Sequence, residues 1–323
     1  MKAIVRTKYG SPDVLKLQEI DKPSPTDNQV LVRVQAAAVN PLDWHILRGE
    51  PFLVRLMGFG LLKPKHQILG ADMAGRVEAV GKNVIQFKSG DEVFGSSMGG
   101  FAEYACVCED KLVLKPAAMT FEQAAAVPVA GITALQALRD HGQIQAGQHV
   151  LINGASGGVG TFAVQIAKAL GAHVTGVCSG RNLEMVRSIG ADHVIDYTKE
   201  EFWRSGKEYD LILDNAAFQS ISKSLHALKA TGVYVLVGGS SSTASILRSL
   251  ILNPLISKTR GRKVVSFMAN VNQRDLTVLK ELLEAGKVVP VIERKYSLSE
   301  VPQTIRYVEE GHTRGKVVIT VHQ

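Results

Sequence analysis

The stretch that decides the fold is residues 149–168, HVLINGASGGVGTFAVQIAK. A short apolar run, HVLIN, leads into a loop of small residues, and Phe162, Ile166 and Leu170 then recur at helical spacing. Residues 155–160 match the pattern GxGxxG, with alanine in the first place. Small residues let the backbone approach a pyrophosphate, whose charge meets the N–H groups and positive end of the following helix. The stretch therefore predicts a dinucleotide-binding strand, loop and helix.

The segments around this stretch predict two kinds of domain. Downstream, the apolar runs HVTGVCSG, HVIDY, YDLILDNA and GVYVLVGG alternate with helical segments, which is typical of a doubly wound parallel sheet. Upstream, residues 1 to about 115 contain short strand-like runs separated by turn residues such as DKPSPTDN, which predicts a β-rich, partly open barrel. We expect RKVVSFMAN and the helix DLTVLKELLEAG to close the parallel sheet, and the last strand to return to the barrel. The fold class is α/β.

Size and composition restrict the possible functions. A chain of 323 residues is long enough for two domains, each with its own core. The net charge of +7 favours an anionic partner such as a phosphorylated cofactor, and no nucleic-acid recognition motif is present. Three cysteines without a CxxC pair or a Cys/His cluster indicate neither a disulfide framework nor a metal site. Since no apolar run is long enough to span a membrane, we expect a cytoplasmic protein without a membrane span.

The end of the second strand of the nucleotide fold bears on the choice of cofactor. An NAD site normally places Asp or Glu there, whereas this chain reads Cys178-Ser179-Gly180-Arg181. Ser179 and Arg181 are suited to bind a 2′-phosphate by hydrogen bond and charge, which favours NADPH. The alternative is that Arg181 only lies exposed at the start of a helix.

A hydrolase is a rival interpretation of the same loop. Residues 154–158 also read GxSxG, the pattern of a nucleophile elbow, with Ser156 as nucleophile and Asp214 and His226 or His312 following in the required order. Against this, a hydrolase would have α/β units before its elbow strand, and here about 115 β-rich residues precede it.

Several motifs together resemble the medium-chain dehydrogenase/reductase superfamily, in its zinc-free quinone oxidoreductase branch. They are VNPLDWHILRG, ILGADMAGRVEAVG, FKSGDEVFG, VPVAGITALQAL, INGASGGVGTFAVQIAK, SIGADHVIDY and HTRGKVVI, and they cover essentially the whole chain. The resemblance implies a GroES-like domain of residues 1–121, a Rossmann domain of residues 122–286 and a return segment, 287–323, that completes the GroES-like domain. It also implies a homodimer that transfers hydride from NADPH to a quinone or an α,β-unsaturated carbonyl.

The same resemblance implies that no metal takes part. Zinc-dependent members carry Cys and His where this chain has Asn40 and Ala71, so the Lewis acid would lack its ligands. Hydrogen-bond donors must then stabilise the developing oxyanion. Asn40 and Thr133 are the expected donors, since relatives place both near the nicotinamide.

Asn40 also fits a purely structural role. In VNPLDW it is a candidate helix N-cap, with Pro41 at the first helical position and Asp43 at the third. Capping uses the side-chain oxygen and leaves the amide N–H able to donate, so the two roles are compatible. His45 in the same helix is more typical of packed structure and is left out of the catalytic set.

The resemblance also transfers a set of cofactor contacts. The residues expected to bind NADPH are Ser156, Gly157, Gly158, Val159 and Gly160 at the pyrophosphate, Ser179, Arg181 and Tyr197 at the phosphate end, Asn215 near the ribose, and Phe267, His312, Thr313 and Arg314 as further candidates.

Three other interpretations stay open. Enoyl-thioester reductases share the fold but resemble a pattern with an acidic Tyr, which is missing from HILRGEPFLVRLMGFGLLKPKH. Some relatives serve as lens crystallins or bind RNA without catalysis. Finally, PFLVRLMGFGLLKPK and ILRSLILNPLISKTRGRK combine apolar residues with cations, which would suit a membrane surface or a lipophilic substrate. For these two segments we expect buried helix faces with exposed Lys and Arg instead.

Overall fold

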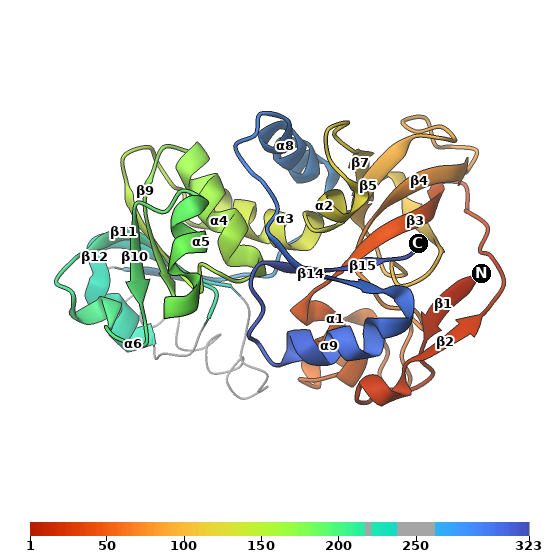
Figure 1. Ribbon diagram of the computed structural model, residues 1–323, viewed down its shortest axis with the longest axis horizontal. Coiled ribbons are helices and arrows are strands. Elements are labelled where there is room, and N and C mark those ends of the chain that lie inside the picture. Colours follow the sequence, from red (N-terminus) through yellow and green to blue (C-terminus); the bar gives the residue numbers. More distant parts are fainter. Residues whose placement is uncertain (217–220, 238–261, 323) are drawn as a thin grey trace. The chain divides into compact units, whose positions relative to one another are not determined.

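The computed structural model describes residues 1–216, 221–237 and 262–322, and the chain divides into two compact units (Figure 1). The first unit holds residues 1–132, 271–284 and 290–323, and the second holds residues 133–270 and 285–289. Residues 246–261, most of the second apolar segment named above, lie outside the described residues. No helix within the described ranges has both the length and the apolar character needed to cross a bilayer.

The first unit is built on a mainly antiparallel sheet in the order β14-β15-β3-β4-β5-β7, with β6 paired to β3. Its strands and helices are β1 (Lys2–Val5), β2 (Lys16–Glu19), β3 (Gln29–Val39), α1 (Pro41–Arg48), β4 (Asp72–Val80), β5 (Glu92–Ser96), β6 (Tyr104–Cys108), β7 (Leu112–Leu114), α2 (Phe121–Ala125), α8 (Gln273–Glu284), β14 (Ile292–Ser297), α9 (Val301–Glu309) and β15 (Lys316–Thr320). The last strand pairs antiparallel with β3, and Val317 lies opposite Val39. The expected return of the C-terminus to the β-rich domain is therefore confirmed.

The helix α8 does not close the parallel sheet, so that expectation is wrong. Its buried face, formed by Leu276, Leu279 and Leu283, packs in the first unit, where α8 lies against β7. Leu279 comes so close to Gly131 that a Cβ on that glycine would lie 3.0 Å from the leucine Cδ1. The units thus divide the chain at residues other than the expected domain bounds of 121 and 286, and those bounds stay a prediction.

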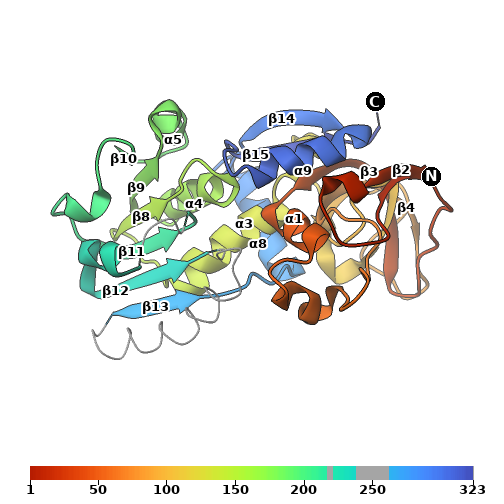
Figure 2. The same ribbon diagram turned by 90° about the horizontal axis from the view of Figure 1, so that it is seen from below.

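The second unit is a parallel sheet with the strand order β10-β9-β8-β11-β12-β13 (Figures 1 and 2). Its elements are β8 (His149–Asn153), α4 (Gly158–Ala169), β9 (His173–Cys178), α5 (Leu183–Ser188), β10 (His193–Asp196), β11 (Tyr209–Asp214), α6 (Ile221–Ser224), β12 (Leu228–Leu236) and β13 (Lys263–Ser266), and α3 (Pro128–Gln136) runs into it from the first unit. Counted along the chain from β8, this order is 3-2-1-4-5-6, the Rossmann arrangement. It confirms the predicted doubly wound sheet and places the loop after β8 where the strand order reverses.

Candidate active site

The loop between β8 and α4 has a backbone that only small residues allow. Gly154 adopts φ +76°, in the left-handed region that favours glycine. A Cβ on Gly160 would lie 2.1 Å from the Gly154 carbonyl oxygen, so α4 can pack this closely only with glycine there. Gly157 is the N-cap, and the amides of the first turn of α4 have no acceptor one turn earlier in the helix. The loop therefore has the shape and the donors for a pyrophosphate.

Asn182 ties this loop to the end of β9. Its side chain is buried, and its Nδ2 donates to Ser156 Oγ at 3.1 Å and to Ser179 Oγ at 3.2 Å. Arg181, next to it, is exposed. The sequence indicated the two serines and Arg181, but not the asparagine that holds the serines together. In the sequence, an Asn at the start of a helix looks the same whether it caps the helix or bonds to these two serines.

A carboxylate lies near the same end of the sheet, although it belongs to the neighbouring strand. Asp196 ends β10 in register with Cys178 of β9. Its Oδ1 accepts from the hydroxyl of Thr198 at 2.7 Å, and this bond is the main reason that the pKa of Asp196 lies below its usual value. Lys199 Nζ lies 4.0 Å from Oδ2. Only Oδ1 is therefore satisfied, and the buried Oδ2 has no hydrogen-bond partner among the described residues.

The remaining cofactor candidates are distributed over both units. In the second unit, Asn215 donates from Nδ2 to the Asn153 carbonyl at 3.3 Å, and its buried Oδ1 has no hydrogen-bond partner among the described residues. Tyr197 is 62% exposed, and the Phe267 ring lies 4.1 Å from that of His141. Thr133 is buried in α3.

The segment His312-Thr313-Arg314 belongs to the first unit, between α9 and β15. There the backbone N–H of Arg314 donates to Glu293 Oε2 at 2.9 Å. The structure therefore does not gather all the candidates within one unit.

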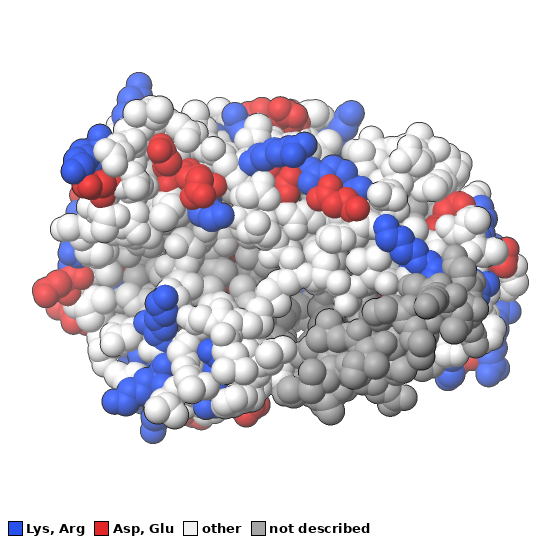
Figure 3. Space-filling model, turned by 180° about the vertical axis from the view of Figure 1, so that it is seen from behind, with Lys and Arg blue, Asp and Glu red and all other residues white. Residues whose placement is uncertain are grey.

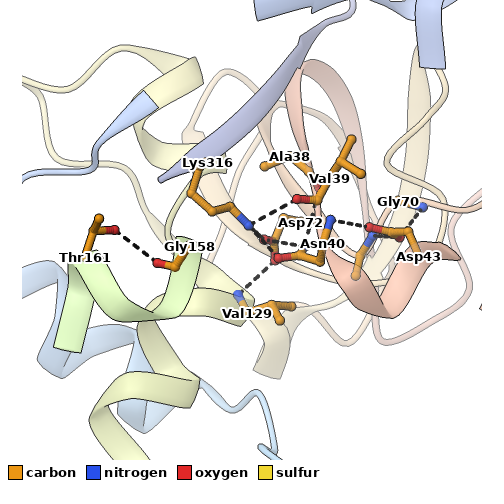
Figure 4. Close-up of polar contacts among 11 residues, drawn as sticks. Ala38, Val39, Asn40, Asp43, Gly70, Asp72, Val129, Gly158, Thr161 and Lys316 are labelled. Atoms are coloured by element: carbon orange, nitrogen blue, oxygen red, sulfur yellow. Dashed lines mark hydrogen bonds and ion pairs between the residues drawn. The ribbon is translucent and has the colours of Figure 1, made fainter. Parts of the chain in front are cut away.

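A buried polar cluster lies in the first unit, where β3 leads into α1 (Figure 4). Lys316, the first residue of β15, points its Nζ at Asn40 Oδ1, 2.5 Å away, and at Asp72 Oδ2, 3.3 Å away. Asn40 Nδ2 in turn donates to Asp72 Oδ2 at 2.8 Å. The Asp72 side chain is fully buried and that of Lys316 is 3% exposed. We call Asn40, Asp72 and Lys316 the Asn–Asp–Lys cluster.

The cluster fixes which way the Asn40 carboxamide faces. An ammonium can only donate and a carboxylate can only accept, so the amide oxygen must face Lys316 and the amide nitrogen must face Asp72. The second amide N–H has only a 3.5 Å contact with the Ala38 carbonyl. The second amide N–H of Asn40 can therefore still donate a strong hydrogen bond to another acceptor.

Asp72 is held by a third donor, the backbone N–H of Val129 at 2.9 Å. Burial raises the pKa of its carboxyl, while Lys316, Asn40 and this N–H favour the ionised form. Three donors therefore surround the Asp72 carboxylate inside the unit.

Asp43 supports the same corner from the helix side. Its Oδ2 accepts the backbone N–H of Asn40 at 2.8 Å, as in a capping box, and its Oδ1 accepts the N–H groups of Gly70 and Ala71, each at 3.2 Å. Burial is the largest cause that raises the pKa of Asp43 to about 7, and these backbone donors oppose it. His45 stacks on Trp44 with ring centroids 3.6 Å apart, which agrees with the packing role expected for it.

The prediction that the Asn40 oxygen caps the helix missed its stronger bond to Lys316. Asp72 and Lys316 were also missed, although both lie within quoted motifs, LGADMAG and HTRGKVVI. Each is a lone charge in an apolar strand run, which is a signal of burial and pairing. Only the antiparallel pairing of β3 with both β4 and β15 brings the two together.

Comparison with known proteins agrees with the fold and with these motifs. Two family models match: the alcohol dehydrogenase GroES-like domain over residues 26–117 and zinc-binding dehydrogenase over residues 189–319. The mitochondrial NAD(P)H oxidoreductase RTN4IP1 of Bos taurus is 36% identical over 99% of this chain and 89% of that protein. The chloroplastic quinone-oxidoreductase QR1 of Triphysaria versicolor is 34% identical over 99% of this chain and 98% of that protein. This chain belongs to the medium-chain dehydrogenase/reductase family.

Solved structures place it in the quinone oxidoreductase branch of that family. The quinone oxidoreductase of Coxiella burnetii has a TM-score of 0.88 and 33% identity, covering 100% of this chain and 99% of that one. The quinone oxidoreductase of Escherichia coli complexed with NADPH has a TM-score of 0.84 and 26% identity, covering 99% of this chain and 100% of that one. The medium-chain dehydrogenase/reductase described here is thus an oxidoreductase of an NAD(P)H-dependent family that acts on small molecules.

The comparisons also correct the expected location. RTN4IP1 and QR1 are named as mitochondrial and chloroplastic proteins, so the expectation of a cytoplasmic protein is wrong. Composition and the lack of a long apolar run do not distinguish the cytoplasm from the interior of an organelle.

The geometry gives no support to the hydrolase interpretation. Ser156 Oγ accepts from Asn182, and the carboxylate of Asp214 is held by Asn153 Nδ2 at 2.9 Å and the Tyr234 hydroxyl at 2.5 Å. His226 is exposed, with its Nδ1 3.3 Å from the Lys223 carbonyl oxygen. The loop after β8 is a glycine loop of a Rossmann sheet, as the strand order shows.

Proposed function

We propose that this protein transfers hydride from NADPH to a quinone or an α,β-unsaturated carbonyl, with Asn40 as the donor to the developing oxyanion and without a metal. The observation that carries the proposal is the Asn–Asp–Lys cluster, which holds the Asn40 carboxamide in one orientation inside the first unit. The second unit supplies the cofactor-binding loop.

The residues of the second unit fit NADPH. The close approach at Gly160 would be filled by any Cβ, and the unpartnered Asn215 Oδ1 suits a hydroxyl donor such as a ribose. We assign Ser179 Oγ and the Arg181 guanidinium to a 2′-phosphate by hydrogen bond and charge, whereas the Asp196 carboxylate, which ends the neighbouring strand with an unpartnered Oδ2, is the group that would favour NADH instead. When bound, the cofactor supplies the hydride, and the protein only binds and orients it.

In the first unit, Lys316 and Asp72 act as positioning residues for Asn40. The ammonium on Oδ1 polarises the carboxamide and so strengthens its N–H groups as donors, while Asp72 orients the amide nitrogen. The N–H that faces only the distant Ala38 carbonyl is the one that we assign to the substrate oxygen. A preoriented donor of this kind contributes on the order of 3 kcal/mol in a dry site.

The same cluster does not fit a catalytic zinc ion. Asn40 and Ala71 stand where zinc-dependent members have Cys and His, and the Lys316 ammonium already places a positive charge 2.5 Å from Asn40 Oδ1. Among the described residues no group of three or more His, Cys, Asp or Glu is arranged to hold a metal. We therefore assign no step to a metal.

Steady-state turnover tests the proposal. Purified protein is given NADPH or NADH with a panel of quinones, 2-alkenals and enoyl thioesters, with and without a chelator. We expect NADPH oxidation with quinones or enones that a chelator leaves unchanged. Preference for enoyl thioesters would assign the alternative, an enoyl-thioester reductase, and activity lost on chelation would refute the metal-free mechanism. Gel filtration of the same sample tests the expected homodimer.

A further inference from the structure

The segment that follows α1 exposes an unusual concentration of apolar side chains. It comprises residues 51–66, PFLVRLMGFGLLKPKH, and includes an irregular helical turn, Arg55–Phe59. The expectation of a buried helix face is wrong here. The exposed fractions are Phe52 53%, Leu56 60%, Met57 44%, Leu61 51% and Leu62 88%. We call these five side chains the 52–62 surface.

This apolar surface is held in place from its inner side. Val54 and Phe59 pack against the core of the first unit. The Tyr9 hydroxyl donates to the Phe59 carbonyl at 2.8 Å and to the Gly60 carbonyl, and the N–H of Lys65 donates to the Phe59 carbonyl at 2.8 Å. The segment is thus fixed by its inward-facing residues. Its other apolar side chains still face solvent.

The charged residues within and just after the 52–62 surface are all cations, and the exposed Glu50 lies just before it. Residues 51–71 contain Arg55, Lys63 and Lys65 and no Asp or Glu. Arg55 is used internally, since its guanidinium lies 4.4 Å over the Tyr9 ring and donates to the Gly49 carbonyl at 3.0 Å. Lys63 and Lys65 are exposed beside the apolar side chains. Figure 2 shows the segment in orange beside α1, and Figure 3 shows Lys and Arg side chains among uncharged ones on the face opposite to that of Figure 1.

Single exposed apolar residues need no explanation, as Ile85, 89% exposed, illustrates. Five within eleven consecutive residues, followed by two exposed lysines, do need one. We propose that the 52–62 surface docks onto a lipid bilayer that contains anionic lipids. The apolar side chains enter the interface between headgroups and acyl chains, and Lys63 and Lys65 meet the anionic headgroups.

Vesicle flotation with the full chain tests this proposal. Phosphatidylcholine vesicles with and without phosphatidylglycerol are compared for wild type, Leu61→Asp/Leu62→Asp and Lys63→Glu/Lys65→Glu. We expect binding to the anionic vesicles, reduced at least about tenfold by either double substitution. High salt should weaken the binding, since the lysine contribution is screened.

Ile85→Asp is the matched control, because it also removes an exposed aliphatic side chain from the first unit. It should bind vesicles like wild type. Leu62→Ser alone is the second variant if the double substitution lowers the melting temperature, since Leu62 is 88% exposed. No binding by wild type, or equal binding by all variants, overturns the proposal. So does self-association of wild type that Leu61→Asp/Leu62→Asp abolishes without any vesicle binding, because the surface would then fit a second copy of the chain.

Discussion

Replacing Lys316 by Met should destabilise the first unit strongly. The substitution keeps a side chain of similar length but removes the ammonium that lies 3.3 Å from Asp72 Oδ2. Asp72 would then be a fully buried carboxylate with only Asn40 Nδ2 and the Val129 N–H as donors. Breaking a buried ion pair from one side costs about 3 to 5 kcal/mol, since the remaining charge loses its compensation. We expect a loss of unfolding free energy in that range.

Trp44 offers a probe of this unit alone. The sequence has two tryptophans, and Trp203 lies in the second unit, so a Trp203→Phe background leaves Trp44 as the only fluorescent indole. Urea unfolding would be measured for Lys316→Met, Asp72→Asn and the double variant. Removing both charges leaves no isolated ion, so the double variant should lose about 2 to 3 kcal/mol less than the two single losses added together.

The control is the same substitution at an exposed ion pair. Lys295 Nζ lies 3.0 Å from Glu122 Oε1 and its side chain is 54% exposed, so Lys295→Met should cost no more than about 1 kcal/mol. If the losses of Lys316→Met and Asp72→Asn are simply additive, the pair is not coupled, and the role that we give to Lys316 as a positioning residue is refuted.

Three further predictions concern single residues. Because the folded pKa of Asp43 is about 7 and its unfolded pKa lies near 3.9, the folded state keeps a proton that the unfolded state has lost between these values. The contribution of the Asp43 proton to the unfolding free energy is complete below about pH 4. It is lost as the pH rises to 7, by at most on the order of 4 kcal/mol. Melting temperatures of Asp43→Asn measured against pH should lack this decline. Gly160→Ala would place a Cβ 2.1 Å from the Gly154 carbonyl oxygen, so titration calorimetry should show NADPH binding abolished in a protein that still contains an intact first unit. Arg181→Ala should raise the KM for NADPH about tenfold while leaving that for NADH unchanged, and equal effects on both would remove Arg181 from the 2′-phosphate site.

The nucleotide-binding half could be predicted closely from the sequence because its signals are local. The strand, the glycine loop and the helix follow one another within residues 149–168, and the fully apolar runs identify buried parallel strands. The helix α8 was assigned to the wrong unit for the opposite reason. Its leucine face shows that it is buried, but no local pattern says against which sheet.

The Asn–Asp–Lys cluster was less predictable because its residues come from distant segments of the chain. Asn40 is locally recognisable as a helix start, whereas Asp72 and Lys316 are brought into contact only by the pairing of β3 with β4 and β15. The exposed segment 51–66 was misjudged because apolar content predicts burial on average. Its outward direction follows from the bonds of Tyr9 and from the packing of Phe59, which composition does not contain.

The position of Lys316 also determines when the cluster can form. Lys316 and Asn40 are 276 residues apart, and β15 must pair with β3 before the ammonium reaches the amide. The second unit, almost all of it the continuous stretch 133–270, lies within this interval and makes its contacts over shorter separations. Pairing two strands that are far apart in the sequence costs loop-closure entropy. This cost is smaller when the unit between them is already folded, because the flexible part of the chain is then shorter. The second unit should therefore fold first, and the Asn40 carboxamide becomes oriented only when β15 is in place. A buried charge pair suits this final step, because a strand shifted by one residue would leave both Asp72 and Lys316 uncompensated, so the pair enforces the correct register.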